Sequence, residues 1–213
     1  MLELGITCFL AYLIGSVSGS LLVGRALGGG DIRSEGRGNA GATNALRTRG
    51  LSFALPLVLI DIGKGALAAS VVPALGLVAQ DPAMPRLHLQ ACAASAAVIG
   101  HIWPFWHDFR GGKGAATLVG TYLVLAPGAV GPVVLLWLLG VVATGYVGLW
   151  TMLAASAGPV YLWLSGADAS LVGFGAGMAL LLVFAHRENI HRMRAGTENR
   201  MTQAMFWRRK DTS

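Results

Sequence analysis

Long apolar runs separated by short polar segments are the feature that most limits the folds open to this chain. A helix needs ~20 mostly apolar residues to cross a bilayer, and the chain offers several such runs. Only 12% of its 213 residues are charged and 54% are hydrophobic, whereas soluble domains carry about 25% charged residues. So few charges cannot cover a soluble globule, and a disordered chain would be less hydrophobic. The sequence therefore predicts an all-α, polytopic membrane protein.

Seven runs are expected to be transmembrane helices, within a single integral-membrane domain over residues 1–213. The runs cover about 4–27, 51–79, 87–106, 115–126, 130–147, 149–164 and 171–185. Fourteen of the 16 Lys and Arg residues fall in 25–49, 107–114 and 186–213, which seven spans place on one side. Cytoplasmic loops carry an excess of these residues. We therefore expect the N-terminus outside the cytoplasm and the C-terminus inside it.

The first polar segment, residues 34–47 (SEGRGNAGATNALR), has the composition of an anion site. The chain has 30 glycines, about twice the usual share. Glycines let helices pack closely in lipid or let loop N–H groups surround an anion, and many lie in loops beside cations. An arginine beside such a loop suits phosphate, although a flexible positive-inside loop is the alternative. The side chains assigned here are Arg37, Asn39, Thr43, Asn44 and Arg47.

Residues 101–114 (HIWPFWHDFRGGKG) bring glycines and a lysine to the expected start of a helix. A helix N-terminus offers N–H donors and a positive dipole end to an anion. The loop is not a Walker A motif, because glycine follows the lysine. The aromatic residues are typical of the membrane interface, and the first histidine either ends a helix with a hydrogen bond or belongs to the site. The residues assigned here are His101, Gly111, Gly112, Lys113 and Gly114.

Asp61 and Lys64 are charges inside the second apolar run. Charges within a span are costly, so they usually face the bundle interior and have a partner. The i, i+3 spacing allows the two to pair with each other. Either the pair only fixes helix packing or Lys64 contributes to a binding site, and we assign Lys64 to the site.

Residues 185–198 (AHRENIHRMRAGTE) supply the last polar group. His186 and Asn189 share one face if the segment is helical. His186 and His191 do not, which disfavours a two-histidine metal site. No acidic cluster suits a two-metal phosphotransferase either, so we expect no metal and no cofactor. We assign His186, Asn189 and Arg187 to the site.

Four segments, 38–47, 61–65, 101–117 and 186–198, together resemble the bacterial integral-membrane acyl-phosphate:glycerol-3-phosphate acyltransferases. The resemblance covers essentially the whole chain. It implies transfer of a fatty acyl group from acyl phosphate to the sn-1 hydroxyl of glycerol 3-phosphate. The products are lysophosphatidate and phosphate, and the reaction is the first step of phospholipid synthesis. It further implies the bacterial cytoplasmic (inner) membrane, an active site on the cytoplasmic face, contact with membrane lipid, no nucleic acid and no obligate protein partner.

The resemblance also implies roles for single residues. The loop 111–114 is associated with glycerol 3-phosphate, and we expect Lys113, Arg47, His186 and Asn189 to be catalytic. The substrate-binding set is then Arg37, Asn39, Thr43, Asn44, Lys64, His101, Gly111, Gly112, Gly114 and Arg187. Glu198 is expected to be structural.

One position departs from the family, which usually has serine where this chain has Arg37. Arginine keeps affinity for phosphate but cannot act as both donor and acceptor. Thr43 or Ser34 is left to supply a hydroxyl. The general base is either His186, whose unperturbed pKa of ~6.5 suits the task, or a phosphate of a substrate.

Two further functions stay open at this point. A transporter for a phosphorylated molecule also accounts for charges within spans, although the outer loops are short and poor in charge. An acyltransferase that uses acyl carrier protein or acyl-CoA as donor accounts for the same residues.

Overall fold

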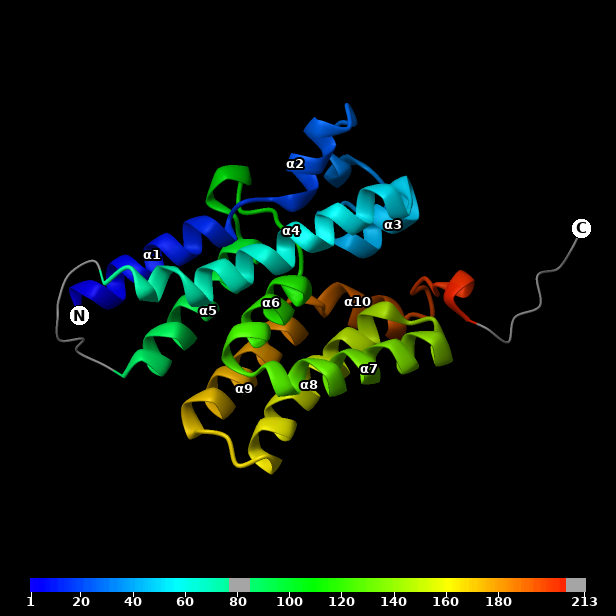
Figure 1. Ribbon diagram of the computed structural model, residues 1–213. Helices are drawn as coiled ribbons and strands as arrows, with labels where there is room; N and C mark the ends of the chain where they lie inside the picture. Colours follow the sequence, from blue (N-terminus) through cyan, green and yellow to red (C-terminus); the bar gives the residue numbers. More distant parts are fainter. Residues whose placement is uncertain (77–84, 206–213) are drawn as a thin grey trace, which may run out of the picture. The chain divides into compact units, whose positions relative to one another are not determined.

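The computed structural model describes residues 1–76 and 85–205, and every regular element within those ranges is a helix (Figure 1). The all-α prediction is therefore confirmed for this part of the chain. The last residues of the expected run 51–79, from 77 onward, lie outside the described residues. The chain divides into two compact units, Met1–Pro127 and Gly128–Ser213.

The described residues of the first unit, 1–76 and 85–127, form six α-helices and three short 3-10 turns. The helices are α1 (Leu2–Gly15), α2 (Gly19–Ala26), α3 (Ala42–Arg49), α4 (Leu51–Ser70), α5 (Arg86–Ile102) and α6 (Ala115–Leu125), and the turns are η1 (Ile32–Ser34), η2 (Val72–Ala74) and η3 (Phe105–His107). Helix α1 packs along α5, and α4 packs along α6 (Figure 1). The first expected run, 4–27, is bent by 40° between α1 and α2. Residues 16–18 lie between the two helices at this bend.

Glycines fasten both of these helix pairs. A methyl group at any of four helical glycines would overlap the backbone carbonyl of the facing helix. The glycines and carbonyls are Gly15 with Ala97, Gly100 with Tyr12, Gly65 with Thr117, and Gly120 with Ile62. Small residues let helix backbones approach closely in lipid. The glycine content thus serves helix packing as well as the polar loops.

The second unit contains helices α8 and α9 packed against each other, with α7 and α10 beside them. The elements are α7 (Pro127–Thr144), α8 (Val147–Leu164), α9 (Ala169–Ala185), α10 (Arg187–Arg194) and the turn η4 (Thr202–Ala204). The indole N–H of Trp137 donates to Thr151 at 3.1 Å and joins α7 to α8. Helices α9 and α10 meet at a bend of 54°, so residues 185–198 are not one straight helix.

Among the described residues, three helical segments are long and apolar enough to cross a membrane by themselves: Leu51–Ala74, Pro127–Thr144 and Val147–Leu164. Counting each bent pair as one span, α1 with α2 and α9 with α10, raises the number to five. Helix α6 is apolar but shorter, with 11 residues. The described part of each expected run contains an α-helix, and the first run contains two, while the count of seven spans and the orientation stay predictions.

Candidate active site

A small pocket in the first unit brings together residues from several predicted segments. It lies between the bend after α1, helix α4, the end of α5 and the glycine loop before α6. Four residues assigned to substrate binding line it: Lys64, His101, Gly111 and Gly112. Ser16 and Ser18 of the bend also line it, and no motif in the sequence had pointed to them.

Three buried polar side chains form one wall of this pocket. Asp61, Lys64 and His101 are 2%, 6% and 7% exposed. The Lys64 ammonium lies 2.9 Å from Asp61 Oδ1 and donates to the carbonyl of Val17 at 2.7 Å. Nδ1 of His101 lies 3.5 Å from the same Asp61 oxygen. The ion pair therefore holds the bend between α1 and α2, where helix ends leave carbonyls without an intrahelical partner. A substrate contact by Lys64 stays a prediction.

The glycine loop is fastened to the end of α5. The Gly111 N–H donates to the Ile102 carbonyl and the Gly112 N–H to the His101 carbonyl, both at 3.2 Å. A methyl group at Gly112 would overlap Nε2 of His101, so the imidazole lies directly against this glycine. These two N–H groups hold the loop in shape, whereas the sequence predicted that they would surround an anion.

Gly114 and Lys113 complete the loop at the start of α6. Gly114 has a φ of +85°, which glycine adopts without steric strain, and it is the residue before the first turn of the helix. A methyl group there would also press against Val98 at 3.0 Å. Lys113 is half-buried between the glycines. The lysine thus lies at the N-terminal end of an 11-residue helix, as the sequence predicted.

The loop before α3 is organised by the side chain of Asn44, which is 5% exposed. Its Nδ2 donates to the carbonyls of Ile32, Glu35 and Asn39 at 3.3, 3.1 and 3.0 Å. Its Oδ1 accepts from the N–H of Arg37 at 2.9 Å. Both ends of the amide therefore bind backbone, so Asn44 shapes the loop. Its predicted contact with substrate stays a prediction.

The other predicted residues of this loop lie nearer the surface. Oδ1 of Asn39 accepts from the N–H of Gly41 at 2.8 Å, a local turn that precedes α3. Arg37 and Arg47 are exposed and Thr43 is half-buried. Their roles toward substrate stay predictions.

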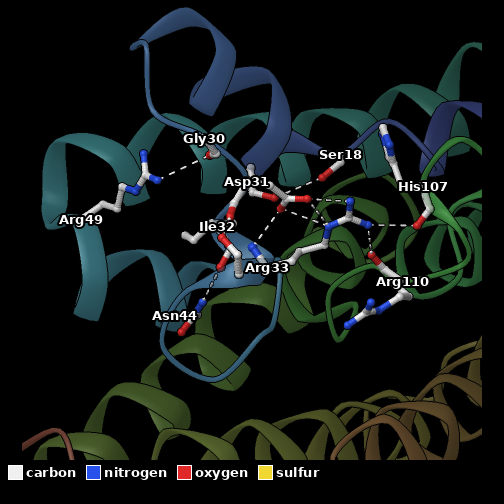
Figure 2. A network of polar contacts seen from close by, with 11 residues as sticks. Ser18, Gly30, Asp31, Ile32, Arg33, Asn44, Arg49, His107 and Arg110 are labelled. Atoms are coloured by element: carbon white, nitrogen blue, oxygen red, sulfur yellow. Dashed lines mark hydrogen bonds and ion pairs between the residues drawn. The ribbon is translucent and has the colours of Figure 1, made fainter.

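Arg33 joins the loop before α3 to the loop before α6, and sequence reasoning missed it. Nε and Nη2 of Arg33 bind the Asp31 carboxylate, with distances down to 2.7 Å. Nη1 donates to the carbonyls of His107 and Arg110 at 3.0 and 3.1 Å (Figure 2). Hydrogen bonds from the guanidinium lower the pKa of Asp31, and the carboxylate raises the pKa of Arg33. An Asp-x-Arg pattern in a polar segment was the available signal.

The last predicted group lies in the second unit, around the bend between α9 and α10. His186 is 4% exposed, and its Nδ1 lies 2.8 Å from the Leu182 carbonyl. Asn189 is 6% exposed and donates to Glu198 at 2.8 Å. Glu198 also accepts from Nε of Arg192 at 2.6 Å. Glu198 thus has the structural contacts expected of it, because it fixes the amide of Asn189.

Arg187 is exposed beside this group and turns back toward α9. Its guanidinium donates to the Phe184 carbonyl at 3.3 Å and lies 4.7 Å from the centre of the Phe184 ring. The contact is a cation–π interaction. The structure therefore gives Arg187 an anchoring contact, and its binding role stays a prediction.

Apolar helices joined by basic, glycine-rich loops define this chain as a multi-pass membrane protein. A family model described as "Glycerol-3-phosphate acyltransferase" matches residues 5–196. The chain belongs to the glycerol-3-phosphate acyltransferase family, which confirms the family to which the four sequence segments pointed.

Similar proteins agree with this assignment. Glycerol-3-phosphate acyltransferases of Chlorobaculum parvum and Cereibacter sphaeroides are 37% and 39% identical. The alignments cover 90% and 94% of this chain and 94% and 91% of those proteins. The crystal structure of PlsY, an integral membrane glycerol 3-phosphate acyltransferase, in its glycerol 3-phosphate form has a TM-score of 0.82 at 29% identity. That match covers 93% of this chain and 95% of PlsY. The lysophosphatidic acid form of PlsY has a TM-score of 0.80, with 92% and 94% covered.

Proposed function

We propose that this chain transfers a fatty acyl group from acyl phosphate to the sn-1 hydroxyl of glycerol 3-phosphate. The products are 1-acyl-glycerol 3-phosphate and phosphate, and the reaction opens phospholipid synthesis. The observation that carries the proposal is the likeness to PlsY in forms with glycerol 3-phosphate and with lysophosphatidic acid. Lys113 at the start of α6 supports it, because a helix N-terminus with a lysine suits a phosphate.

In this proposal the acceptor hydroxyl attacks the acyl carbonyl directly. The carbon–oxygen bond to phosphate breaks, and phosphate leaves with the bonding electrons. An acyl phosphate is already activated, so the protein supplies mainly orientation and charge stabilisation. Lys113, Arg47 and Lys64 hold phosphate groups, and Asn189, kept in place by Glu198, orients a polar group. This division of work needs neither a metal nor a cofactor.

His186 is the protein group proposed to receive the hydroxyl proton. The Leu182 carbonyl can only accept a hydrogen bond, so Nδ1 of His186 must be the donor and must carry the proton. In a neutral imidazole the other nitrogen, Nε2, is then the basic one. Removal of a general base lowers turnover by ~10²–10⁴-fold. If His186→Ala and His186→Gln keep near-normal turnover, a phosphate of a substrate acts as base instead.

We further propose that the chain acts as one domain over residues 1–213, with seven spans in a bacterial cytoplasmic membrane and the active site on the cytoplasmic face. The family match supports one domain because it runs across the division between the two units. Fourteen cations in three segments support the orientation by the positive-inside rule.

The decisive test incubates the purified protein with glycerol 3-phosphate and acyl phosphate, acyl-CoA or acyl carrier protein in separate reactions. We expect lysophosphatidate with acyl phosphate only, and weaker use of glycerol 3-phosphate in Lys113→Ala. Arg110→Ala removes the same charge from an exposed position three residues earlier and serves as the matched control. No lysophosphatidate with any donor refutes the proposal, and uptake of a phosphate ester into vesicles would then favour a transporter.

A further inference from the structure

Two successive residues before the glycine loop adopt a conformation that side chains disfavour. Asp108 and Phe109 both have φ near +55°, and they are the non-glycine residues with positive φ within the described chain. For a bulky residue such as phenylalanine this left-handed conformation is a true outlier. Strained residues persist only where the surroundings hold them, and they cluster at functional sites.

Arg33 holds the carbonyl on each side of this strained pair. Its Nη1 donates to His107, immediately before the pair, and to Arg110, immediately after it (Figure 2). The turn also has its own bonds, from the Phe109 N–H to Pro104 and from the Arg110 N–H to His107, both at 3.1 Å. Neither of these bonds reaches outside residues 104–110. Arg33 is thus the side chain that ties the turn to the loop before α3.

The Arg33 guanidinium is itself held in place by Asp31, so it can fix the position of the backbone that it binds. The Asp31 carboxylate accepts from Nε and Nη2, so all three nitrogens of Arg33 have partners. Arg33 is 17% exposed and Asp31 39% exposed at the side chain. A guanidinium engaged in this way has little capacity left for a substrate phosphate, because its five donors lie in one rigid plane.

The strained turn leads directly into the loop that carries Lys113. Gly111 follows Arg110, and the N–H groups of Gly111 and Gly112 already bind the end of α5. The loop is therefore held by the end of α5 and entered from the strained turn, so the turn is one of two supports that place the lysine. A shift of ~1 Å in such a group is large compared with the tolerance of a reacting site.

We infer that Arg33, held by Asp31, is a positioning residue for the glycine–lysine loop at 111–114. The inference rests on the proposed function, in which Lys113 binds glycerol 3-phosphate. Arg33 acts through the backbone of the strained turn, whereas Lys113 acts on the substrate. Loss of Arg33 lets the turn relax and moves the lysine out of place.

The first experiment measures hydrogen exchange of the peptide 105–114 in the full-length protein in detergent. Arg33→Ala is expected to speed exchange in this peptide at least tenfold. Arg33→Lys is expected to behave like Arg33→Ala, because an ammonium cannot bridge two carbonyls and a carboxylate. Arg49→Gln is the matched control: it breaks the ion pair with Glu35 in the same loop and leaves exchange of 105–114 unchanged. Unchanged exchange in Arg33→Ala overturns the inference. Asp31→Asn, which weakens the same clamp more mildly, gives the same test if Arg33→Ala does not fold.

The second experiment relates the clamp to the reaction by comparing Michaelis constants for glycerol 3-phosphate. We expect Arg33→Ala to raise this constant about tenfold, and the double variant with Lys113→Ala to add nothing beyond Lys113→Ala. Residues that act through one another are non-additive in this way. If the increases in the Michaelis constant from Arg33→Ala and Lys113→Ala multiply in the double variant, or if Arg33→Lys restores the wild-type constant, Arg33 contacts the substrate directly and the inference is overturned. Absence of lysophosphatidate from the wild type refutes the proposed function instead, and an active wild type with an unaffected Arg33→Ala refutes only the positioning role.

Discussion

Replacing Lys64 by methionine tests how much the buried ion pair contributes to stability. The change keeps most of the side-chain volume but leaves the Asp61 carboxylate, 2% exposed, without its cation. It also removes the donor at 2.7 Å from the Val17 carbonyl. Breaking a buried pair from one side costs ~3–5 kcal/mol, and loss of the hydrogen bond to the partly buried Val17 carbonyl costs ~0.5–1.5 kcal/mol. Because His101 remains 3.5 Å from Asp61 and offsets part of this, we expect a loss of about 3–5 kcal/mol in all.

A second substitution separates the charge from the packing. In the double variant Asp61→Asn with Lys64→Met, no uncompensated charge remains, and the new amide still offers His101 an acceptor. The Val17 carbonyl still loses its lysine donor, which costs ~0.5–1.5 kcal/mol. The double variant is therefore expected to be about 2 kcal/mol more stable than Lys64→Met alone.

The assay is unfolding of the purified protein by increasing mole fraction of SDS in mixed micelles, followed by loss of helical circular dichroism. Arg86→Met removes a cation from an exposed position and is expected to stay within about 0.5 kcal/mol of wild type. A loss of less than about 1 kcal/mol in Lys64→Met, or a double variant no more stable than the single one, would show that the buried charge of Asp61 does not need Lys64.

Three further changes have expected outcomes. Gly112→Ala drives a methyl group into the imidazole of His101, so we expect it to lower the free energy of unfolding by ~1–3 kcal/mol and to lower activity. Gly63 is exposed with open space around its Cβ, so Gly63→Ala should leave the free energy of unfolding unchanged or raise it by ~0.5–1 kcal/mol in the same assay. Asn44→Ala removes the partner of several backbone groups and should cost about 2 kcal/mol or more, measured as a lower thermal midpoint. The lowered pKa of Asp31 means that its contribution is present above the ordinary carboxyl value of ~3.9 and is lost as pH falls through the lowered pKa. Exchange of peptide 105–114, divided by the intrinsic exchange rate at each pH, should therefore quicken below about pH 4 and stay flat from pH 5 to 7.

The helical elements were largely predictable, because apolar runs of this length leave few alternatives. The expected separation of the runs 130–147 and 149–164 is found between α7 and α8, at residues 145–146. The bend between α1 and α2 was not predicted, because residues 4–27 read as one apolar run. A side chain far along the chain binds the backbone at this bend, because Lys64 donates to the carbonyl of Val17. A contact across 47 residues leaves no local pattern in the sequence.

The candidate site was predictable in its residue types and less so in their contacts. Asn44 was selected as a polar group in a glycine-rich segment, yet its amide is occupied by the backbone around it. His101 was expected either to end a helix or to join the site. Its carbonyl holds the glycine loop and its ring lines the pocket, while its contact with substrate stays a prediction. Arg33 was passed over because its partners include backbone carbonyls, and every residue of a sequence has one. Only the fold shows which carbonyls come within reach.

The close packing of α1 and α5 through Gly15 and Gly100 has a consequence for how the chain is synthesised. Helix α1 leaves the ribosome first, but the backbone against which Gly15 fits belongs to a helix that begins at Arg86. At ~5–20 residues per second, the about 70 residues between them take roughly 4–14 s to synthesise. For that time the leading helix has to stay in the membrane without the neighbour its glycine fits. Slowing translation between the two helices should therefore lengthen the period in which the nascent protein depends on the insertion machinery.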